Sequence, residues 1–404
     1  MNAVGIDVSK GKSTVAVMQP FGVVVASPYE VSHTESELKE LARFLKSLPG
    51  ETKVLMEYTG HYYEPIARAL HEAGIFVSVI NAILVHDYSG NTLRRVKTDK
   101  KDAIKLAYML LDRWLELREY VPEEELRQTL KICNRQYNQY NKLKTMLKNN
   151  LIALLDQTFP GVNKLFSSPA RKCDGHEKWV DFALKFWHCE CVCSISERAF
   201  TDKYRRWCAK NGYYFTETKA SDIYASACGH IGTLPMCDSV KTLVTQAIIQ
   251  LQTIEETLAT LRSEMKRICE ALPEYDTVMA LYGVGEVFGC QLIAEIGDVS
   301  RFKSKKALIA FAGIDPPSNQ SGQVDVKSRS ISKLGSASLR KVLFQVMSVI
   351  IQNSPQDEPV FQFLDKKRAE GKPYKVYMIA AANKFLRIYY ARVMETLNSL
   401  DLAA

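Results

Sequence analysis

Three stretches near the start of the chain alternate apolar and polar residues with the two-residue period of β-strands. They read AVGIDVS, STVAVMQP and GVVVASPYEV, and Gly-Lys and Pro-Phe-Gly turns separate them. The pattern predicts a meander of three antiparallel strands over residues 3–30. Helices and strands then alternate in the order TESELKELARFLKSL (helix), KVLMEYT (strand), HYYEPIARALHEAG (helix), IFVSVIN (strand) and KDAIKLAYMLLDRW (helix).

This order of elements is that of an RNase H-like (RuvC-like) α/β domain, in which helices pack against a mixed sheet. We assign it residues 1–120. Two long helical stretches with heptad spacing then predict a coiled-coil region over residues 121–272, interrupted by a globular insertion at 161–237 that is rich in Cys, Trp and Tyr. The second stretch could pair with the first or with another subunit. A mostly helical domain follows at 273–404.

The charge balance favours a polyanionic partner without proving one. The 404 residues carry 53 Lys and Arg against 45 Asp and Glu, a formal net charge of +8. No run of apolar residues is long enough to span a membrane, and the N-terminus lacks the order of a signal peptide, so we expect a cytoplasmic protein. Its ten cysteines should be reduced.

One local cluster of metal-binding residue types occurs in the stretch WHCECVC. On a strand, Cys189, Cys191 and Cys193 would share one face beside His188. Zinc sites usually draw their ligands from separated Cys pairs, so ordinary buried or half-buried thiols are the favoured interpretation and a metal site is the alternative.

Two carboxylates fall where strand patterning does not explain them. Asp7 lies in the middle of the strand VGIDVS, on the face opposite Ile6 and Val8, where Asp is disfavoured and an unpaired buried charge is costly. Glu57 ends the fourth strand directly after apolar residues, and in an RNase H-like sheet the fourth strand lies beside the first. We therefore expect Asp7 and Glu57 to face each other.

The stretch KTDKKDA sets Asp99 and Asp102 three residues apart at the start of the next helix. They could simply form a capping-box-like start, with Asp99 as the N-cap. The spacing also puts both on one face of a helix that packs against the sheet holding Asp7. Four converging carboxylates would repel one another unless divalent cations bind them. The pattern predicts two Mg²⁺ ions about 4 Å apart, suited to phosphodiester chemistry and held by Asp7, Glu57, Asp99 and Asp102.

Basic residues surround these acids. They predict contacts to a phosphate backbone, although a solvated basic flank without nucleic acid is the alternative. The residues are Arg94, Arg95, Lys97, Lys100 and Lys101.

The last domain contains two further candidate sites. Gly283 and Gly285 in ALYGVGEVFG either form a helix-hairpin-helix turn, whose backbone N–H groups bind phosphate, or make a purely structural turn. A loop rich in Pro, Ser and Gly then leads to the basic residues Lys327, Arg329, Lys333 and Arg340. A serine in this loop could attack phosphorus. Chemistry alone does not choose among Ser318, Ser321, Ser328, Ser330 and Ser332.

Several of these motifs together resemble the insertion-sequence 110 family of transposases, which join a RuvC-like DEDD domain to a serine-bearing transposase domain. The matching stretches are GIDVSK, MEYTGHYY, KTDKKDA, LYGVGEVFGCQLIAEIGDVSRF, AFAGIDPPSNQSG and GKPYKVYMIAAANKFL. They occur in the family's order and, with the first long helix, cover most of residues 1–160 and 270–392.

The resemblance implies that Asp7, Glu57, Asp99 and Asp102 form the DEDD metal site and that Ser321 is the nucleophile. It also implies an RNA-guided DNA recombinase that binds donor and target DNA and a structured noncoding guide RNA. The family acts as a homodimer that becomes a tetramer on synapsis. For such a DNA-binding protein we expect a cytoplasmic location in a prokaryote, in association with the nucleoid. The sequence departs from the family's Ser-Ser-Gly-Gly motif, because Gln320 and Gln323 flank the Ser-Gly pair.

Two other functions remain open from sequence. One is a RuvC-like structure-selective DNA endonuclease in which metal-activated water attacks the phosphodiester. The other is a noncatalytic RNA-binding or architectural protein.

Overall fold

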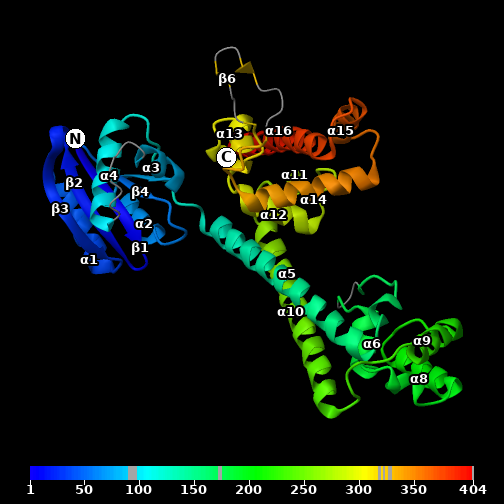
Figure 1. Ribbon diagram of the computed structural model, residues 1–404. Helices are drawn as coiled ribbons and strands as arrows, with labels where there is room; N and C mark the ends of the chain where they lie inside the picture. The colour runs from blue at the N-terminus through cyan, green and yellow to red at the C-terminus, as the bar shows by residue number, and fades with distance from the viewer. Residues whose placement is uncertain (90–97, 172–174, 317–319, 322–323, 326–329, 403–404) are drawn as a thin grey trace. The chain divides into compact units, whose positions relative to one another are not determined.

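The computed structural model describes residues 1–89, 98–171, 175–316, 320–321, 324–325 and 330–402. The chain divides into two compact units, Met1–Glu123 and Glu124–Ala404, which we call unit 1 and unit 2 (Figure 1). No helix within the described ranges combines the length and the apolar character that a membrane span requires.

Unit 1 is built on a five-stranded mixed sheet with the order β3-β2-β1-β4-β5. The first three strands form the antiparallel meander that the alternating pattern predicts, and β1 pairs in parallel with β4, as does β4 with β5. The strands are β1 (Asn2–Ser9), β2 (Lys12–Gln19), β3 (Val23–Ser32), β4 (Thr52–Glu57) and β5 (Phe76–Ile80). This is the predicted RNase H-like order, with the fourth strand beside the first.

Helices cover both faces of this sheet. On one face, α1 (Glu35–Ser47) and α2 (Glu64–Glu72) enclose a core that includes Ile6 and Met56. On the other face, α4 (Asp99–Asp112) packs Leu106 and Ala107 against Ala3 and Leu55. A short helix that the sequence analysis did not predict, α3 (Ala82–Ser89), precedes α4.

Unit 2 is mostly helical and is organised around two long helices, α5 (Glu125–Thr158) and α10 (Asp238–Glu270), which lie side by side (Figure 1). The heptad seam of α10 therefore has its partner within the same chain. Leu151 of α5 shares a core with Val244, whereas Leu130 shares another with Met265, so the two helices run antiparallel. Burial of the seam against α5 resolves the alternative that the sequence left open.

The insertion between these helices folds around an aromatic cluster. Phe182 stacks on Phe186, and Tyr204 stacks on Phe200 and Trp207. Its helices are α6 (Lys178–Lys185), α7 (Glu190–Cys193), α8 (Glu197–Lys210) and α9 (Glu217–Gly229), with the 3-10 turn η2 (Val162–Lys164) before them.

The cysteine-rich stretch of the insertion is helical, so the strand alternation considered for it is wrong. His188 uses both ring nitrogens for backbone contacts, since Nε2 lies 3.0 Å from the carbonyl oxygen of Leu234 and Nδ1 lies 3.1 Å from the amide nitrogen of Glu190. Cys189 is buried and Cys191 and Cys193 are half-buried thiols, which matches the favoured interpretation.

The remaining helices of unit 2 form a second core with the adjoining ends of α5 and α10. They are α11 (Tyr275–Met279), α12 (Glu286–Ile296), α13 (Lys305–Ala312), α14 (Ala337–Asn353), α15 (Pro359–Ala369) and α16 (Tyr374–Asp401), with the 3-10 turn η3 (Val299–Arg301). A two-stranded hairpin, β6 (Gln320–Ser321) and β7 (Val324–Asp325), lies between α13 and α14.

Candidate active site

Asp7 and Glu57 lie on neighbouring strands and on the same face of the sheet. The last residue pair of the parallel β1–β4 ladder is Ile6 with Met56, and the two acids follow directly. Ile6 and Met56 point into the core beneath α1 and α2. Because successive strand residues alternate in direction, Asp7 and Glu57 belong to the opposite face, which α4 covers. Both acids are half-buried.

A glycine in the middle of β1 allows α4 to approach the sheet closely. A Cβ atom at Gly5 would lie 2.0 Å from the carbonyl oxygen of Ala103 and 2.4 Å from the amide nitrogen of Ala107. No side chain fits in that space. The backbones of β1 and α4 are therefore in direct contact beside Asp7.

Asp99 and Asp102 lie in the first turn of α4, but neither is its N-cap. The Oγ1 of Thr98 accepts the hydrogen bond from the Lys101 amide, and helical geometry begins at Asp99. The capping-box alternative is therefore wrong, because the threonine one residue earlier already caps the helix. Capping does not account for the two acids.

Electrostatics places this end of α4 near the carboxyl end of β1. The hydrogen bond and charge of Glu30 raise the pKa of Lys12, and the charge of Asp99 adds to this rise. Lys12 pairs with Ser9, the last residue of β1, so Asp99 lies near the end of the strand that carries Asp7. Asp102 is 22% exposed and accepts a hydrogen bond of 3.0 Å from Lys105.

The donor set fits a hard divalent cation, because all four side chains offer only carboxylate oxygens. Among the described residues, no three His, Cys, Asp or Glu side chains stand close enough together to hold a metal ion. The backbone thus brings Asp7, Glu57 and Asp99 to one end of one sheet face, with Asp102 three residues further along α4. A metal ion bound there would require the carboxylates to lie closer together than they do in this structure.

The predicted nucleic-acid contacts of unit 1 are only partly described. Lys100 and Lys101 are exposed in the first turn of α4. Arg94, Arg95 and Lys97 lie outside the described residues.

The turn at Gly283 and Gly285 has a structural role. Gly283 has a φ of 77°, which favours glycine, and a Cβ there would lie 2.8 Å from Cγ1 of Ile350. Gly285 is the N-cap of α12. Phosphate binding by this turn stays a prediction.

The predicted nucleophile Ser321 lies on β6, where its backbone pairs with Val324 of β7. Hydrogen bonds close the base of this loop. Ser332 donates to Asp315 through both its backbone N–H (2.9 Å) and its hydroxyl (2.7 Å), and the backbone N–H of Lys333 donates to Gly313 (3.0 Å). The loop is therefore anchored at both ends on α13 and α14.

Four basic residues beside this loop are predicted to contact nucleic acid, and the structure describes two of them. Arg340 donates from Nη1 to the carbonyl oxygens of Ala312 and Gly335, both at 3.0 Å, so it holds the loop base together. Lys333 adopts a left-handed conformation with a φ of 57°. Lys327 and Arg329 lie outside the described residues. Nucleic-acid binding by these four residues stays a prediction.

Sequence reasoning missed a buried carboxylate that supports the same loop. Glu295 of α12 is 4% exposed and accepts hydrogen bonds from Asn134 of α5 (2.8 Å) and Ser336 (3.1 Å). Ser336 is also the N-cap of α14. Glu295 thus connects the long helix to the start of α14, and the available signal was a Glu within the apolar run LIAEI of α12.

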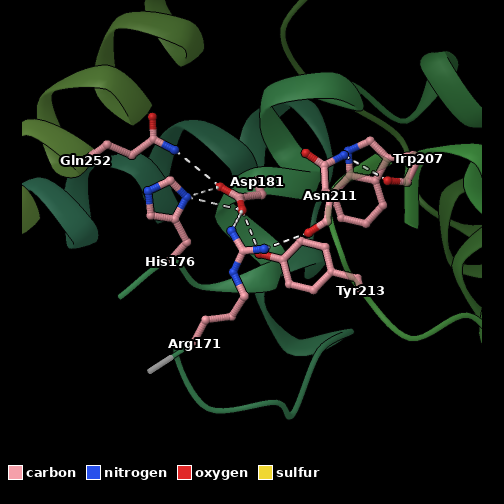
Figure 2. A network of polar contacts seen from close by, with 7 residues as sticks. All are labelled: Arg171, His176, Asp181, Trp207, Asn211, Tyr213 and Gln252. Atoms are coloured by element: carbon pink, nitrogen blue, oxygen red, sulfur yellow. Dashed lines mark hydrogen bonds and ion pairs between the residues drawn. The ribbon is translucent and has the colours of Figure 1, made fainter. Parts of the chain in front are cut away.

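A second missed network surrounds Asp181 in the insertion (Figure 2). Its carboxylate accepts hydrogen bonds from Tyr213 (2.6 Å) and from Gln252 of α10 (3.2 Å), and lies 3.1 Å from Nδ1 of His176. Arg171 lies over the Tyr213 ring. The side chain of Asp181 is 10% exposed, so we interpret the network as the anchor of the insertion on α10.

Two family models match the chain. One, described as "Transposase", covers residues 4–160, and the other, described as "Transposase IS116/IS110/IS902 family", covers residues 275–362. Together they account for more than half of the sequence. The chain belongs to the IS110 family of transposases. Such an enzyme cleaves and joins DNA, and a DEDD carboxylate set on this fold implies dependence on divalent metal ions.

Two named proteins are similar in sequence to this transposase. The "Pilin gene-inverting protein" of Moraxella bovis is 24% identical over 85% of this chain and 80% of its own length. The "Transposase for insertion sequence element IS1111A" of Coxiella burnetii is 26% identical over 34% of this chain and 37% of its own length. A solved structure titled "T. thermophilus RuvC in complex with Holliday junction substrate" aligns with 30% of this transposase and 99% of its own chain, at 13% identity and a TM-score of 0.23.

Proposed function

We propose that this transposase is an RNA-guided DNA recombinase that uses Mg²⁺ at Asp7, Glu57, Asp99 and Asp102 and the hydroxyl of Ser321 as its nucleophile. The observation that supports the proposal most is the position of Asp7 and Glu57. They follow the last in-register pair of two adjacent parallel strands, on the sheet face that α4 covers. The first turn of α4 supplies the other two carboxylates.

The proposed chemistry is a pair of transesterifications. The Ser321 oxygen attacks a DNA phosphorus and loses its proton, a phosphoserine ester forms, and the leaving strand oxygen takes up a proton. The hydroxyl of a second DNA end then attacks the same phosphorus, which restores the serine and joins the new strands. Bound Mg²⁺ would stabilise the charge that develops on the attacking and leaving oxygens. The carboxylates of this chain would orient that ion.

The proposed partners are donor and target DNA, a structured guide RNA, and further copies of the same chain. The matches to the family's motifs, in the family's order, support all three. Exposed Lys100 and Lys101 at the start of α4 supply positive charge for a phosphate backbone. A homodimer that forms a tetramer would let the carboxylates of one subunit serve the serine of another.

A covalent adduct tests the nucleophile. The full-length protein, its candidate guide RNA and target DNA are incubated with Mg²⁺, and the products are separated under denaturing conditions. We expect a protein–DNA adduct that Ser321→Ala abolishes and that the loop control Ser330→Ala retains. Mass spectrometry of the adduct should locate the phosphoserine at residue 321.

The alternative is a RuvC-like endonuclease in which activated water attacks. That enzyme would cleave DNA without an adduct, and Ser321→Ala would leave its cleavage unchanged. Either outcome, or an adduct that persists in Ser321→Ala, contradicts our assignment of the nucleophile.

A further inference from the structure

A groove of about 320 Å³ lies within unit 2, between α5, α12 and α14. All of its lining residues belong to unit 2. Its volume is at the lower end of the range found for small-ligand sites. The side chains that line it indicate what it could bind.

The polar lining of the groove combines positive charge with amide groups. Lys142 comes from α5 and Lys341 from α14, and no carboxylate of the described residues lines the groove. Lys341 donates to the Oδ1 of Asn138 at 2.8 Å. Lys142 is exposed and makes no ion pair within the described part of the chain. The groove therefore attracts a group with negative charge.

Gln291 of α12 is the most informative residue in this lining. It is only 3% exposed, yet its amide makes no hydrogen bond to any residue that the structure describes. Neither Oε1 nor Nε2 is among the fully buried polar atoms that lack a partner, so both atoms of the amide remain accessible from the groove. An outside group that donates and accepts hydrogen bonds would satisfy Gln291, and Asn141 and Gln345 add two more amides to the same wall.

The groove also contains an aromatic ring. Phe288 of α12 is half-buried and lines the groove one helical turn before Gln291. Ring faces stack on nucleobases with little sequence preference, and amides read base edges. Negative charge, hydrogen-bonding edges and a flat apolar face occur together in a nucleotide.

We propose that this groove binds one unpaired nucleotide of a single nucleic-acid strand. Its base would stack on Phe288 and hydrogen-bond to Gln291, and its phosphate would lie near Lys142 and Lys341. The inference rests on the proposed function only in that single-stranded segments of the guide RNA or of the cleaved DNA supply the nucleotide. A base-paired duplex does not fit, because its bases are stacked inside.

Binding of fluorescent single strands to the full-length protein tests the proposal. The probes are oligouridylate, oligothymidylate and a duplex of matched length, followed by fluorescence anisotropy. We expect Gln291→Leu, and separately the double variant Asn141→Ala with Gln345→Ala, to weaken single-strand affinity about tenfold. Duplex affinity should be unchanged. A loss confined to oligouridylate identifies RNA as the source, and a loss confined to oligothymidylate identifies DNA.

Matched controls come from the same helices. Asn149 of α5 and Gln352 of α14 are exposed and do not line the groove, so Asn149→Ala with Gln352→Ala should retain affinity. Gln291→Leu removes no hydrogen bond between described residues and keeps a side chain of similar size, so it should not lower the melting temperature. If that variant misfolds, the double variant Asn141→Ala with Gln345→Ala decides, because both side chains are only half-buried. Groove and control variants that bind single strands equally would overturn the proposal.

A crosslinking measurement gives an independent result. A strand containing one 4-thiouridine, irradiated in complex with the protein, should attach to the peptides that carry Phe288 or Tyr137. Crosslinks only elsewhere would overturn the proposal. Failure of the groove and failure of the proposed function are distinguishable, because the adduct at Ser321 is measured separately from strand binding.

Discussion

At the scale of single residues, the buried ion pair between Arg127 and Glu274 should be costly to break. Glu274 is 1% exposed and Arg127 is 7% exposed, and two guanidinium nitrogens donate to the two carboxylate oxygens. Glu274→Ala leaves a buried cation without this partner. We expect it to lower the free energy of unfolding by about 3–5 kcal/mol, measured by chemical denaturation.

The matched control is the surface pair of Glu264 and Arg267, whose atoms approach to 2.5 Å while both side chains remain well exposed. Water and salt screen such a pair, so Glu264→Ala should leave stability unchanged within error. If both variants lost the same free energy of unfolding, burial of the Arg127–Glu274 pair would not determine its effect on stability.

The residues of the candidate sites differ in how far sequence could predict them. Asp7 and Glu57 were predictable because a carboxylate in an apolar strand breaks the expected pattern. Gln291 and Glu295 carry a similar signal four residues apart on α12, but the partners of Glu295 are Asn134 on α5 and Ser336, the N-cap of α14. Such distant contacts depend on tertiary packing, which no local pattern contains.

At the scale of elements, the close contact between β1 and α4 predicts that a side chain at Gly5 would destabilise unit 1. A Cβ at Gly5 would overlap the backbone of Ala103 and Ala107, so Gly5→Ala must displace the helix that carries Asp99 and Asp102. Overpacking of this kind costs about 3 kcal/mol. We expect the melting transition of unit 1 to fall by about 10 °C, and DNA cleavage to be lost as well.

Gly229, the last residue of α9, provides a control because a Cβ there meets no atom within 4 Å. Gly229→Ala should leave both the melting temperature and DNA cleavage unchanged. A Gly5→Ala protein with wild-type stability and activity would contradict the close approach of α4 to the sheet.

Most elements were predictable, and the exceptions have local causes. The three-strand meander and α1, α2 and α4 follow their hydrophobic periods. The stretch at Cys189–Cys193 was interpreted with a strand alternative, yet a backbone contact from Cys189 to Thr158 and the side chain of His188 hold it as a helical turn. In so short a segment, tertiary contacts outweigh any period.

At the scale of the whole molecule, the seam of α10 shows what periodicity leaves undetermined. Heptad spacing predicts that a helix has a partner but does not say which one. The partner within the chain is α5, and Lys144 of α5 adds an ion pair of 2.8 Å to Glu255 of α10. The proposed homodimer must therefore use other surfaces or the outer faces of these helices.

The two compact units should fold independently, since each has its own cores. The cores of unit 1 draw only on residues up to Tyr120, and those of unit 2 begin at Leu130. A chain cut after Glu123 should therefore yield two stable fragments, residues 1–123 and 124–404, each with a cooperative thermal transition by circular dichroism.

As a control, a cut after Gln252 would divide α10 and separate the two halves of its seam from each other. That cut should leave at least one fragment without a cooperative transition, whereas an unfolded 1–123 fragment would mean that unit 1 needs unit 2 to complete its fold.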